Sequence, residues 1–134
     1  MKKFDNYVSN LEILQKAENE DLGNEFIISG IIDKFSIQFE LSWKVLKELL
    51  RYEGKSAAAS GSPREILKAA YELYDFIDED IWLEMLKSRN DMTHIYDGEA
   101  AKRLVNSILH RYIPEYIKLR DRIFDKYENV LTQI

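Results

Sequence analysis

The chain has 134 residues, no cysteine, 19 basic and 24 acidic side chains, and a formal net charge of −5. This length suits one domain of ordinary size, and the lack of cysteine excludes disulfides, thiolate metal ligands and thiol nucleophiles. The hydrophobic fraction of 46% excludes a disordered chain, and the net acidity argues against an extended surface that wraps RNA or DNA.

Helical spacing of apolar residues dominates the first half of the chain. Apolar side chains recur at three- and four-residue steps over residues 4–14, and a connection follows at residues 19–24. The longest amphipathic segment covers residues 24–53, with Ser42 as the one polar residue on its apolar stripe. The sequence therefore predicts two helices joined by a short connection.

Two helix starts are recognisable in the middle of the chain. Ser62, Pro63 and Glu65 combine a capping serine, a proline at the first helical position and a glutamate at the third. Asp78 is placed to cap a fourth helix, and the Asp-Gly pair at residues 97–98 marks the far boundary of that helix. We therefore expect a short third helix and a longer fourth one.

The last helix opens near Glu99 and carries its apolar stripe to Tyr127. Pro114 lies inside it, lacks a backbone N–H and frees the carbonyl of His110, so we expect a kink at this point. Five helices with short connections predict an all-α fold, an antiparallel helical bundle, in a single domain of residues 1–134.

No apolar stretch approaches the ~20 residues that a membrane-spanning helix requires. Polar residues follow Lys2 and Lys3, where a signal peptide needs its apolar run. We therefore expect a cytoplasmic protein that does not contact a membrane. The sequence has no zinc, calcium or phosphate-loop spacing, so we expect no metal and no cofactor.

Residues 88–98 are polar where a bundle helix should continue its apolar stripe. Positions five apart are ~140° apart around an ideal helix. Arg89 and His94 therefore converge only if the helix loosens or if two copies meet across a dimer, whereas Asn90 and His94 share one face. A guanidinium beside an imidazole suits phosphodiester chemistry, because the first binds phosphate oxygens and the second moves a proton. A plain helix end accounts for the same residues.

The role of several charged residues stays open. Glu40 lies beside the apolar stripe of the second helix, as a surface residue or as a buried carboxylate paired with Lys44 or an arginine. His110 is expected to be structural or exposed. Basic residues on the second and last helices form either solvated faces interleaved with glutamates or a local track for phosphates; they are Lys44, Lys47, Arg51, Lys55, Lys102, Arg103 and Arg111.

The polar segment also resembles a known signature. Arg89, His94 and Tyr96, with Asn90 after the arginine, match the Arg-x4-His-x-Tyr motif of the HEPN superfamily. Residues 33–47, which contain Phe-Glu-x-x-Trp-Lys, are similar to the second-helix motif of one HEPN family, the nucleotidyltransferase substrate-binding proteins. These proteins pair with minimal nucleotidyltransferases. The resemblance covers nearly the whole chain.

The resemblance implies a four-helix up-and-down bundle with an additional helix, and a homodimer that brings two Arg–His motifs together at a cleft. In the toxin branch of the family the motif is a metal-independent endoribonuclease site. His94 is then the general acid–base that activates a ribose 2′-hydroxyl, Arg89 stabilises charge on the phosphate, and Asn90 is a positioning residue. The resemblance also implies that a nucleotidyltransferase encoded nearby neutralises the toxin by transferring AMP to Tyr96.

Three hypotheses about function remain. The first is a ribonuclease toxin of a toxin–antitoxin pair, held in check by its nucleotidyltransferase. The second is a non-catalytic subunit that binds a nucleotide or another substrate and presents it to that enzyme. The third is a helical dimerisation module whose polar segment is only a helix end. The sequence leaves open whether the protein is an enzyme and whether its ligand is RNA or a nucleotide.

Overall fold

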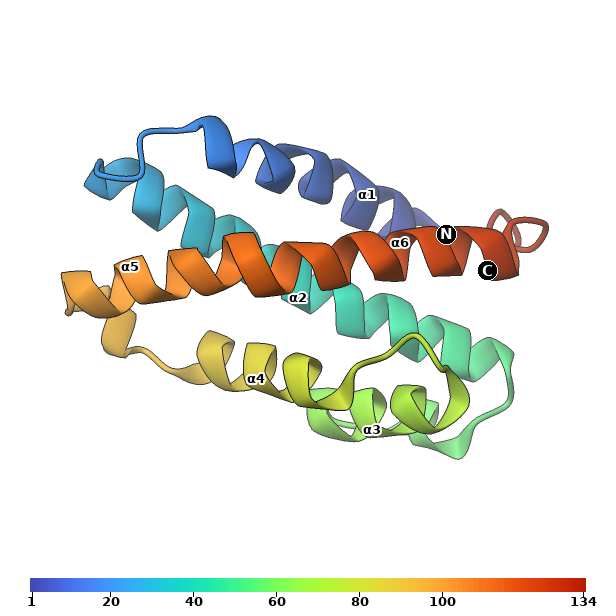
Figure 1. Ribbon diagram of the computed structural model, residues 1–134. Coiled ribbons are helices and arrows are strands. Elements are labelled where there is room, and N and C mark those ends of the chain that lie inside the picture. Colours follow the sequence, from blue (N-terminus) through green and yellow to red (C-terminus); the bar gives the residue numbers. More distant parts are fainter.

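The computed structural model describes residues 1–134, and every regular element in it is helical (Figure 1). The α-helices are α1 (Lys2–Gln15), α2 (Glu25–Tyr52), α3 (Pro63–Leu73), α4 (Glu79–Asn90), α5 (Gly98–Ser107) and α6 (Ile113–Tyr127). Short 3₁₀ turns cover Lys16–Asn19, Ser56–Ala59 and Thr93–Ile95. A π-helical turn at Ile108–Tyr112 makes α5 and α6 one continuous helix, so the predicted five helices are present.

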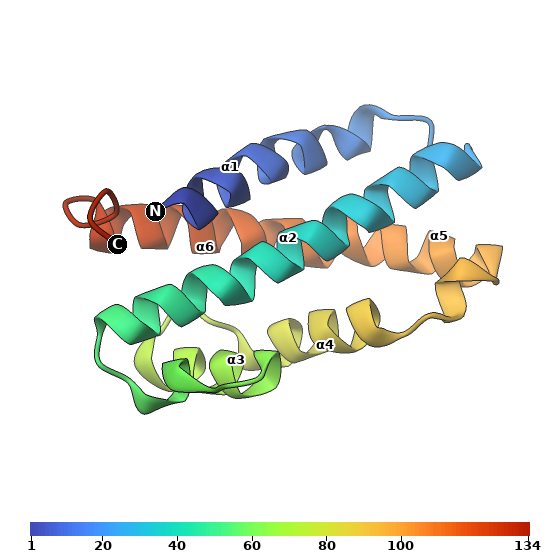
Figure 2. The same cartoon turned by 180° about the vertical axis from the view of Figure 1, so that it is seen from behind.

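The four long elements alternate in direction. Helices α1, α2, α4 and the joined α5–α6 helix run up and down in turn, and α3 is the additional short helix (Figures 1 and 2). Helix α2 contacts α1, α3, α4 and α5, and α1 also packs against α6. Helix α2 is thus the centre of the bundle, and the predicted all-α architecture is confirmed. No helix has the length and the apolar character needed to cross a membrane.

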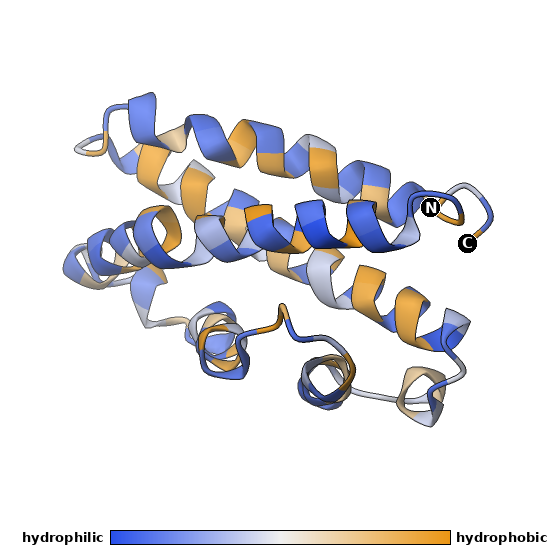
Figure 3. Ribbon diagram, turned by 45° about the vertical axis from the view of Figure 1, so that its right-hand side comes forward, coloured by the Kyte–Doolittle hydropathy of each residue, from blue (hydrophilic) through white to orange (hydrophobic).

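The core is one continuous cluster of 35 buried apolar side chains. Apolar bands recur along α1 and α2 with hydrophilic bands between them, as three- and four-residue spacing requires (Figure 3). Trp82 of α4 lies at the centre, completely buried, with its ring 6.4 Å from that of Phe39 and 5.6 Å from that of Tyr116. These contacts tie α4 to α2 and α6, and they fix where the polar segment after α4 begins.

The predicted helix starts are confirmed by their capping contacts. The Ser62 hydroxyl accepts a hydrogen bond from the Glu65 N–H at 3.3 Å, with Pro63 at the first helical position. The Asp78 carboxylate accepts from the Ile81 N–H at 3.2 Å. Each cap satisfies a backbone donor that has no partner inside its helix, so local sequence decides where these helices begin.

The interruption expected at Pro114 takes the form of a π-helical turn. Ile113 donates its backbone N–H to the carbonyl of Ile108, five residues back rather than four. Pro114, which has no N–H to donate, follows directly. One extra residue in a single turn therefore accommodates the proline, and the helix continues as α6. His110 lies in this turn and is exposed, as expected.

A buried polar network lies between α1 and α2. The sequence indicated only Ser42 as a polar residue on the apolar stripe and did not predict this network. Gln38 is completely buried, donates to the backbone carbonyl of Tyr7 at 3.1 Å, and accepts from the Asn10 side-chain amide at 2.8 Å. Ser42 donates to the Gln38 carbonyl at 2.6 Å. Buried polar groups need such partners, so this network fixes the register of α1 on α2.

Candidate functional site

Helix α4 ends at Asn90, and the prediction that it extends to residues 97–98 is wrong. Asp91 leaves the helix with an extended backbone, and its carboxylate accepts a hydrogen bond from the Thr93 N–H at 2.9 Å. An aspartate that bonds to the backbone two residues ahead offers the chain an alternative to the helix. His94 therefore lies in the following 3₁₀ turn, and Asn90 and His94 do not share a helix face.

Arg89 lies in the last turn of α4 and contacts α2. Its guanidinium is 3.3 Å from the Glu40 carboxylate and 5.5 Å from the centre of the Phe39 ring. Its Nε is buried without a hydrogen-bond partner. Glu40 also lies 3.7 Å from Lys44, so it pairs with both Lys44 and an arginine, but it is about one-third exposed rather than buried. Arg89 is thus held against α2.

His94 lines a different part of the surface. It is partly buried beside a cavity of about 200 Å³, called here the His94 cavity, whose walls come from α4, the loop and α5. Its lining residues are Ser88, Asp91, His94, Ala100, Arg103, Leu104 and Ser107. Arg89 does not line the His94 cavity, so the loosened helix does not by itself bring the Arg89 guanidinium into the space beside His94.

Asp91 supplies negative charge to the His94 cavity. Hydrogen bonding from the side chain and the backbone N–H of Thr93 holds the pKa of the Asp91 carboxyl below its usual value, and nearby His94 and Lys87 lower it further. Asp91 is therefore ionised near neutral pH.

Three lining residues were not singled out as site residues in the sequence. Arg103 and Ser107 belong to α5 and stand four residues apart, so both project from one helix face. Ser88 belongs to α4, and its hydroxyl lies 2.9 Å from the Tyr112 hydroxyl. Burial raises the pKa of Tyr112 to about 12, so this phenol stays protonated. The three-and-four spacing from Ala100 to Ser107 was the signal that could have found this face.

The other motif residues lie outside the His94 cavity. Asn90 is exposed and lines a separate hollow with Arg64, Asp80 and Lys87. Tyr96 is 91% exposed and follows Met92 and Ile95, which are more than half exposed. The loop thus presents apolar and aromatic side chains to the outside. The structure separates Arg89, Asn90, His94 and Tyr96 into different local settings, although a stretch of only eight residues contains them all.

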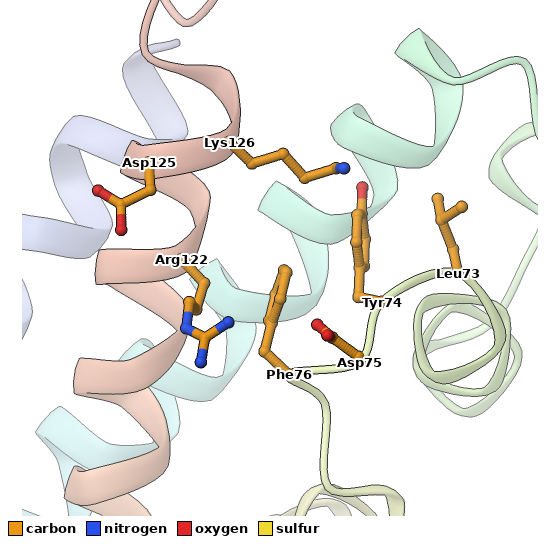
Figure 4. A pocket seen from close by; sticks show the side chains of 7 residues that line it. All are labelled: Leu73, Tyr74, Asp75, Phe76, Arg122, Asp125 and Lys126. Atoms are coloured by element: carbon orange, nitrogen blue, oxygen red, sulfur yellow. The ribbon is translucent and has the colours of Figure 1, made fainter.

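A second cavity, of about 600 Å³, lies between α6 and the connection from α3 to α4. Figure 4 shows Arg122 and Lys126 of α6 facing Tyr74 and Phe76 of that connection. Asp75 and Asp125 also line this cavity, so its two cations are balanced by two carboxylates; the full lining set is Leu73, Tyr74, Asp75, Phe76, Arg122, Asp125 and Lys126. It contains no histidine, and we place the candidate site at the His94 cavity.

Most of the basic residues on the second and last helices lie on solvated faces, as one of the two interpretations of the sequence predicted. Arg51 pairs with Glu48 at 2.9 Å, Arg111 with Glu84 at 3.1 Å, and Lys102 with Glu99 at 3.9 Å. These pairs alternate in sign along the helix surfaces, so they make no continuous track for phosphates. No group of three or more histidine, aspartate or glutamate side chains is arranged to hold a metal ion.

Comparison with known proteins identifies the family. The model of the family described as nucleotidyltransferase substrate binding protein like matches residues 2–125 of the chain. The curated proteins contain no significant match. The all-helical bundle is consistent with the HEPN superfamily. Because the match spans nearly the whole sequence, the chain belongs to the nucleotidyltransferase substrate-binding protein family.

Proposed function

We propose that the protein is the partner of a minimal nucleotidyltransferase and acts as a metal-independent endoribonuclease toxin. The observation that carries this proposal is the setting of His94. Its imidazole lies on a loop at the edge of a polar cavity, beside a guanidinium, an ionised carboxylate and two serines. A titratable imidazole and fixed donors are the groups that cleavage of RNA at a 2′-hydroxyl requires, and no metal ion is needed for it.

In the proposed reaction, His94 accepts the proton of a ribose 2′-hydroxyl as the 2′-oxygen attacks phosphorus. The bond from phosphorus to the 5′-oxygen breaks, and the leaving oxygen takes a proton from an imidazolium. The products are a 2′,3′-cyclic phosphate and a 5′-hydroxyl end. A guanidinium beside the phosphate stabilises the negative charge that develops on its oxygens.

A homodimer completes this site. Arg89 contacts α2 while His94 borders α5, so the two motif side chains face different neighbours within one chain. Two copies meeting through the loop place the Arg89 of one copy near the His94 of the other and provide two imidazoles, one to accept and one to donate a proton. The exposed Met92 and Ile95 supply apolar area for this contact.

Adenylylation of Tyr96 is the proposed means of control. Its side chain is 91% exposed two residues after His94, so a transferase can reach the hydroxyl without unfolding the loop. An adenylyl group there adds bulk and a negative charge beside the His94 cavity. Both effects oppose the entry of RNA, one by steric exclusion and the other by electrostatic repulsion.

The test compares RNA cleavage and growth arrest by the wild type and by single variants, in the absence of the nucleotidyltransferase. We expect His94→Gln to lower the cleavage rate by about 10²–10⁴-fold, as removal of a general acid–base does. His110→Gln is the matched control, because His110 is exposed in the π-helical turn outside the cavity, and it should retain full activity. Intact RNA and normal growth with the wild type would overturn the toxin proposal.

One observation favours a second candidate, a subunit that presents a nucleotide to the transferase without cleaving RNA. Arg89 is occupied by its ion pair with Glu40 and lies outside the His94 cavity, so a single chain lacks the paired Arg–His site. This candidate predicts nucleotide binding at His94 and a stable complex with the nucleotidyltransferase, with no turnover of RNA by either the wild type or His94→Gln.

A further inference from the structure

Arg103 has a guanidinium with no partner in the protein. Four of the seven arginines, Arg51, Arg89, Arg111 and Arg120, form ion pairs with carboxylates. Glu99 stands one helical turn before Arg103, at a spacing that suits an ion pair, yet the Glu99 carboxylate pairs with Lys102 instead. The exposed Arg103 therefore keeps its donors free in a chain with an excess of acidic residues.

The free guanidinium belongs to the same cavity as the imidazole. Arg103 and His94 both line the His94 cavity, together with the hydroxyl-bearing Ser88 and Ser107. Arg64 and Arg122, the other unpaired arginines, border cavities that contain no histidine. Asp91 lines the His94 cavity as well but forms no ion pair with Arg103, so the space between them is open to a ligand.

We infer that the His94 cavity is a phosphate-binding subsite in which Arg103 is the anion-binding residue. This inference rests on the proposed function in one respect: the ribonuclease and the nucleotide-presenting subunit both bring a phosphate to His94. A guanidinium offers several N–H donors in a planar fork that fits phosphate oxygens, and serine hydroxyls add further donors. The chemical class of ligand is a phosphate ester, carried either by RNA or by a free nucleotide.

The size of the cavity limits what it holds. Pockets that enclose a whole small-molecule ligand have volumes of roughly 300–1,000 Å³. The His94 cavity, at about 200 Å³, is smaller, so it takes the phosphate and leaves the base outside. The exposed aromatic ring of Tyr96 and the side chains of Met92 and Ile95 lie on the same loop, where a base outside the cavity can contact them.

The charges of the cavity make phosphate binding depend on His94. Arg103 is positive and Asp91 negative, so these two lining charges offset each other, and a proton on the His94 imidazole adds a further positive charge to the cavity. A bound phosphate is an anion, so the cavity attracts it more strongly when His94 carries a proton. The Lys87 ammonium, which also acts on Asp91, belongs to the same charge group.

The experiment is an NMR titration of the imidazoles in the intact protein. The chain has two histidines, so His94 reports on the cavity and His110 is an internal control. The probes are inorganic phosphate, AMP and a short oligoribonucleotide. We expect each phosphate probe to shift the His94 signals, while the His110 signals do not respond.

The decisive comparison is Arg103→Gln against Lys68→Gln. Both variants remove one positive charge from an exposed helical position, but Lys68 lies on α3 and does not line the cavity. Arg103→Gln should weaken binding of inorganic phosphate by about tenfold or more, and Lys68→Gln by less than about twofold. Equal affinities of the two variants, or a His94 signal that no probe shifts, would overturn the inference. Unchanged His110 signals verify that each variant is folded.

The two proposals fail in different ways. Binding of AMP that requires Arg103, in a protein that leaves RNA intact, supports the phosphate subsite and rejects the ribonuclease. RNA cleavage with the same KM in the wild type and in Arg103→Gln supports the ribonuclease and rejects the subsite. A response to the oligoribonucleotide but not to AMP identifies RNA as the source of the phosphate, and the opposite response identifies a free nucleotide.

Discussion

Arg89 is the motif residue whose side chain is most constrained. Glu40 binds its guanidinium from α2, and the Phe39 ring lies beneath it. An ion pair that is partly exposed, as this one is, contributes less than about 1 kcal/mol to stability. Glu40 therefore matters less for the stability of the fold than for the direction in which Arg89 points, and we regard it as a positioning residue for Arg89.

The first prediction is that Glu40→Gln separates orientation from stability. The variant keeps the shape of the side chain but loses the charge that holds Arg89. We expect the kcat for RNA cleavage to fall about tenfold or more and KM to change less, while the free energy of unfolding changes by less than about 1 kcal/mol. Glu40→Asp, which keeps the charge, should recover part of the rate.

Glu48→Gln is the matched control for Glu40→Gln. Glu48 also lies on α2 and also forms two ion pairs, with Lys3 and Arg51, but it is remote from Arg89. Hydrogen bonding from Lys3 lowers the pKa of the Glu48 carboxyl. The control should lose a similar small amount of stability and no activity. Equal loss of kcat in Glu40→Gln and Glu48→Gln would contradict the positioning role.

At the scale of the element, the loop from residue 91 to residue 97 is held by an aspartate at each end. Asp91 binds the Thr93 N–H, and Asp97 caps α5 by accepting from the Glu99 and Ala100 N–H groups at 3.0 and 3.3 Å. The loop between them carries His94 and Tyr96. The contacts of these two aspartates end α4 and start α5. Because they hold both ends of the loop, they also position the candidate site.

The second prediction concerns Asp97→Ala. Loss of an N-cap costs about 1 kcal/mol, and here it also releases one end of the loop. We expect a drop of that size in the free energy of unfolding, together with changed His94 signals and faster hydrogen exchange at residues 93–97. Asp78→Ala removes the cap of α4 at a similar cost but lies at the opposite end of that helix, so it should leave His94 unchanged.

The same measurement can contradict this view of the loop. If Asp97→Ala and Asp78→Ala lose equal stability and both leave the His94 signals and the exchange rates of the loop unchanged, then the caps set helix boundaries without positioning the site.

Helix starts could be predicted from the sequence, whereas the end of α4 could not. Ser62 and Asp78 act through contacts three residues ahead, so the signal is local. Asp91 can continue a helix or end it; here it ends α4, and its carboxylate accepts a hydrogen bond from the Thr93 N–H. The loop that follows borders a cavity shared with α5, and a short stretch of sequence does not specify such packing between elements.

At the scale of the whole molecule, tyrosines form much of the packing between helices. Five of the eight are buried, and burial raises the pKa of each: Tyr7, Tyr74, Tyr112, Tyr116 and Tyr127. Tyr74 and Tyr127 share a hydrogen bond of 2.6 Å, and Tyr127 donates to Glu53 at 2.9 Å. The fold therefore depends on these phenols staying protonated.

The third prediction is loss of stability at alkaline pH. The pKa values of Tyr74 and Tyr112 are raised to about 12 in the folded protein, above the unfolded value of about 10. Their contribution is complete below pH 10 and is lost as the pH rises toward 12, because unfolding then releases protons. Each such tyrosine lowers the free energy of unfolding by about 1.4 kcal/mol per pH unit in that window.

Chemical denaturation between about pH 8 and pH 11 measures this slope, and the absorbance of tyrosinate reports ionisation. Tyr112→Phe should reduce the pH dependence of the free energy of unfolding by the contribution of one proton, although the variant also loses the contact with Ser88. A free energy of unfolding that stays constant over the whole range would contradict the proposed role of the buried phenols.

The sequence predicted the bundle well but not the composition of the site. Apolar spacing identified the helices because burial of one face is a property of each helix alone. Gln38 and Asn10 bond across two helices, and the cavity that His94 borders is also lined by Arg103 of another element. Such contacts depend on how the helices are placed against one another. The motif spacing therefore identified His94 and Arg89 but not their separate neighbours.

We propose that residues 89–97 are the place where this protein and a nucleotidyltransferase act on one another. Intact-mass and peptide mass spectrometry after incubation with a partner nucleotidyltransferase and ATP tests this most directly. We predict the gain of one AMP on Tyr96, absent in Tyr96→Phe and retained in the control Tyr71→Phe, whose side chain is also exposed but lies on α3. A stable complex in which Tyr96 stays unmodified would contradict the claim.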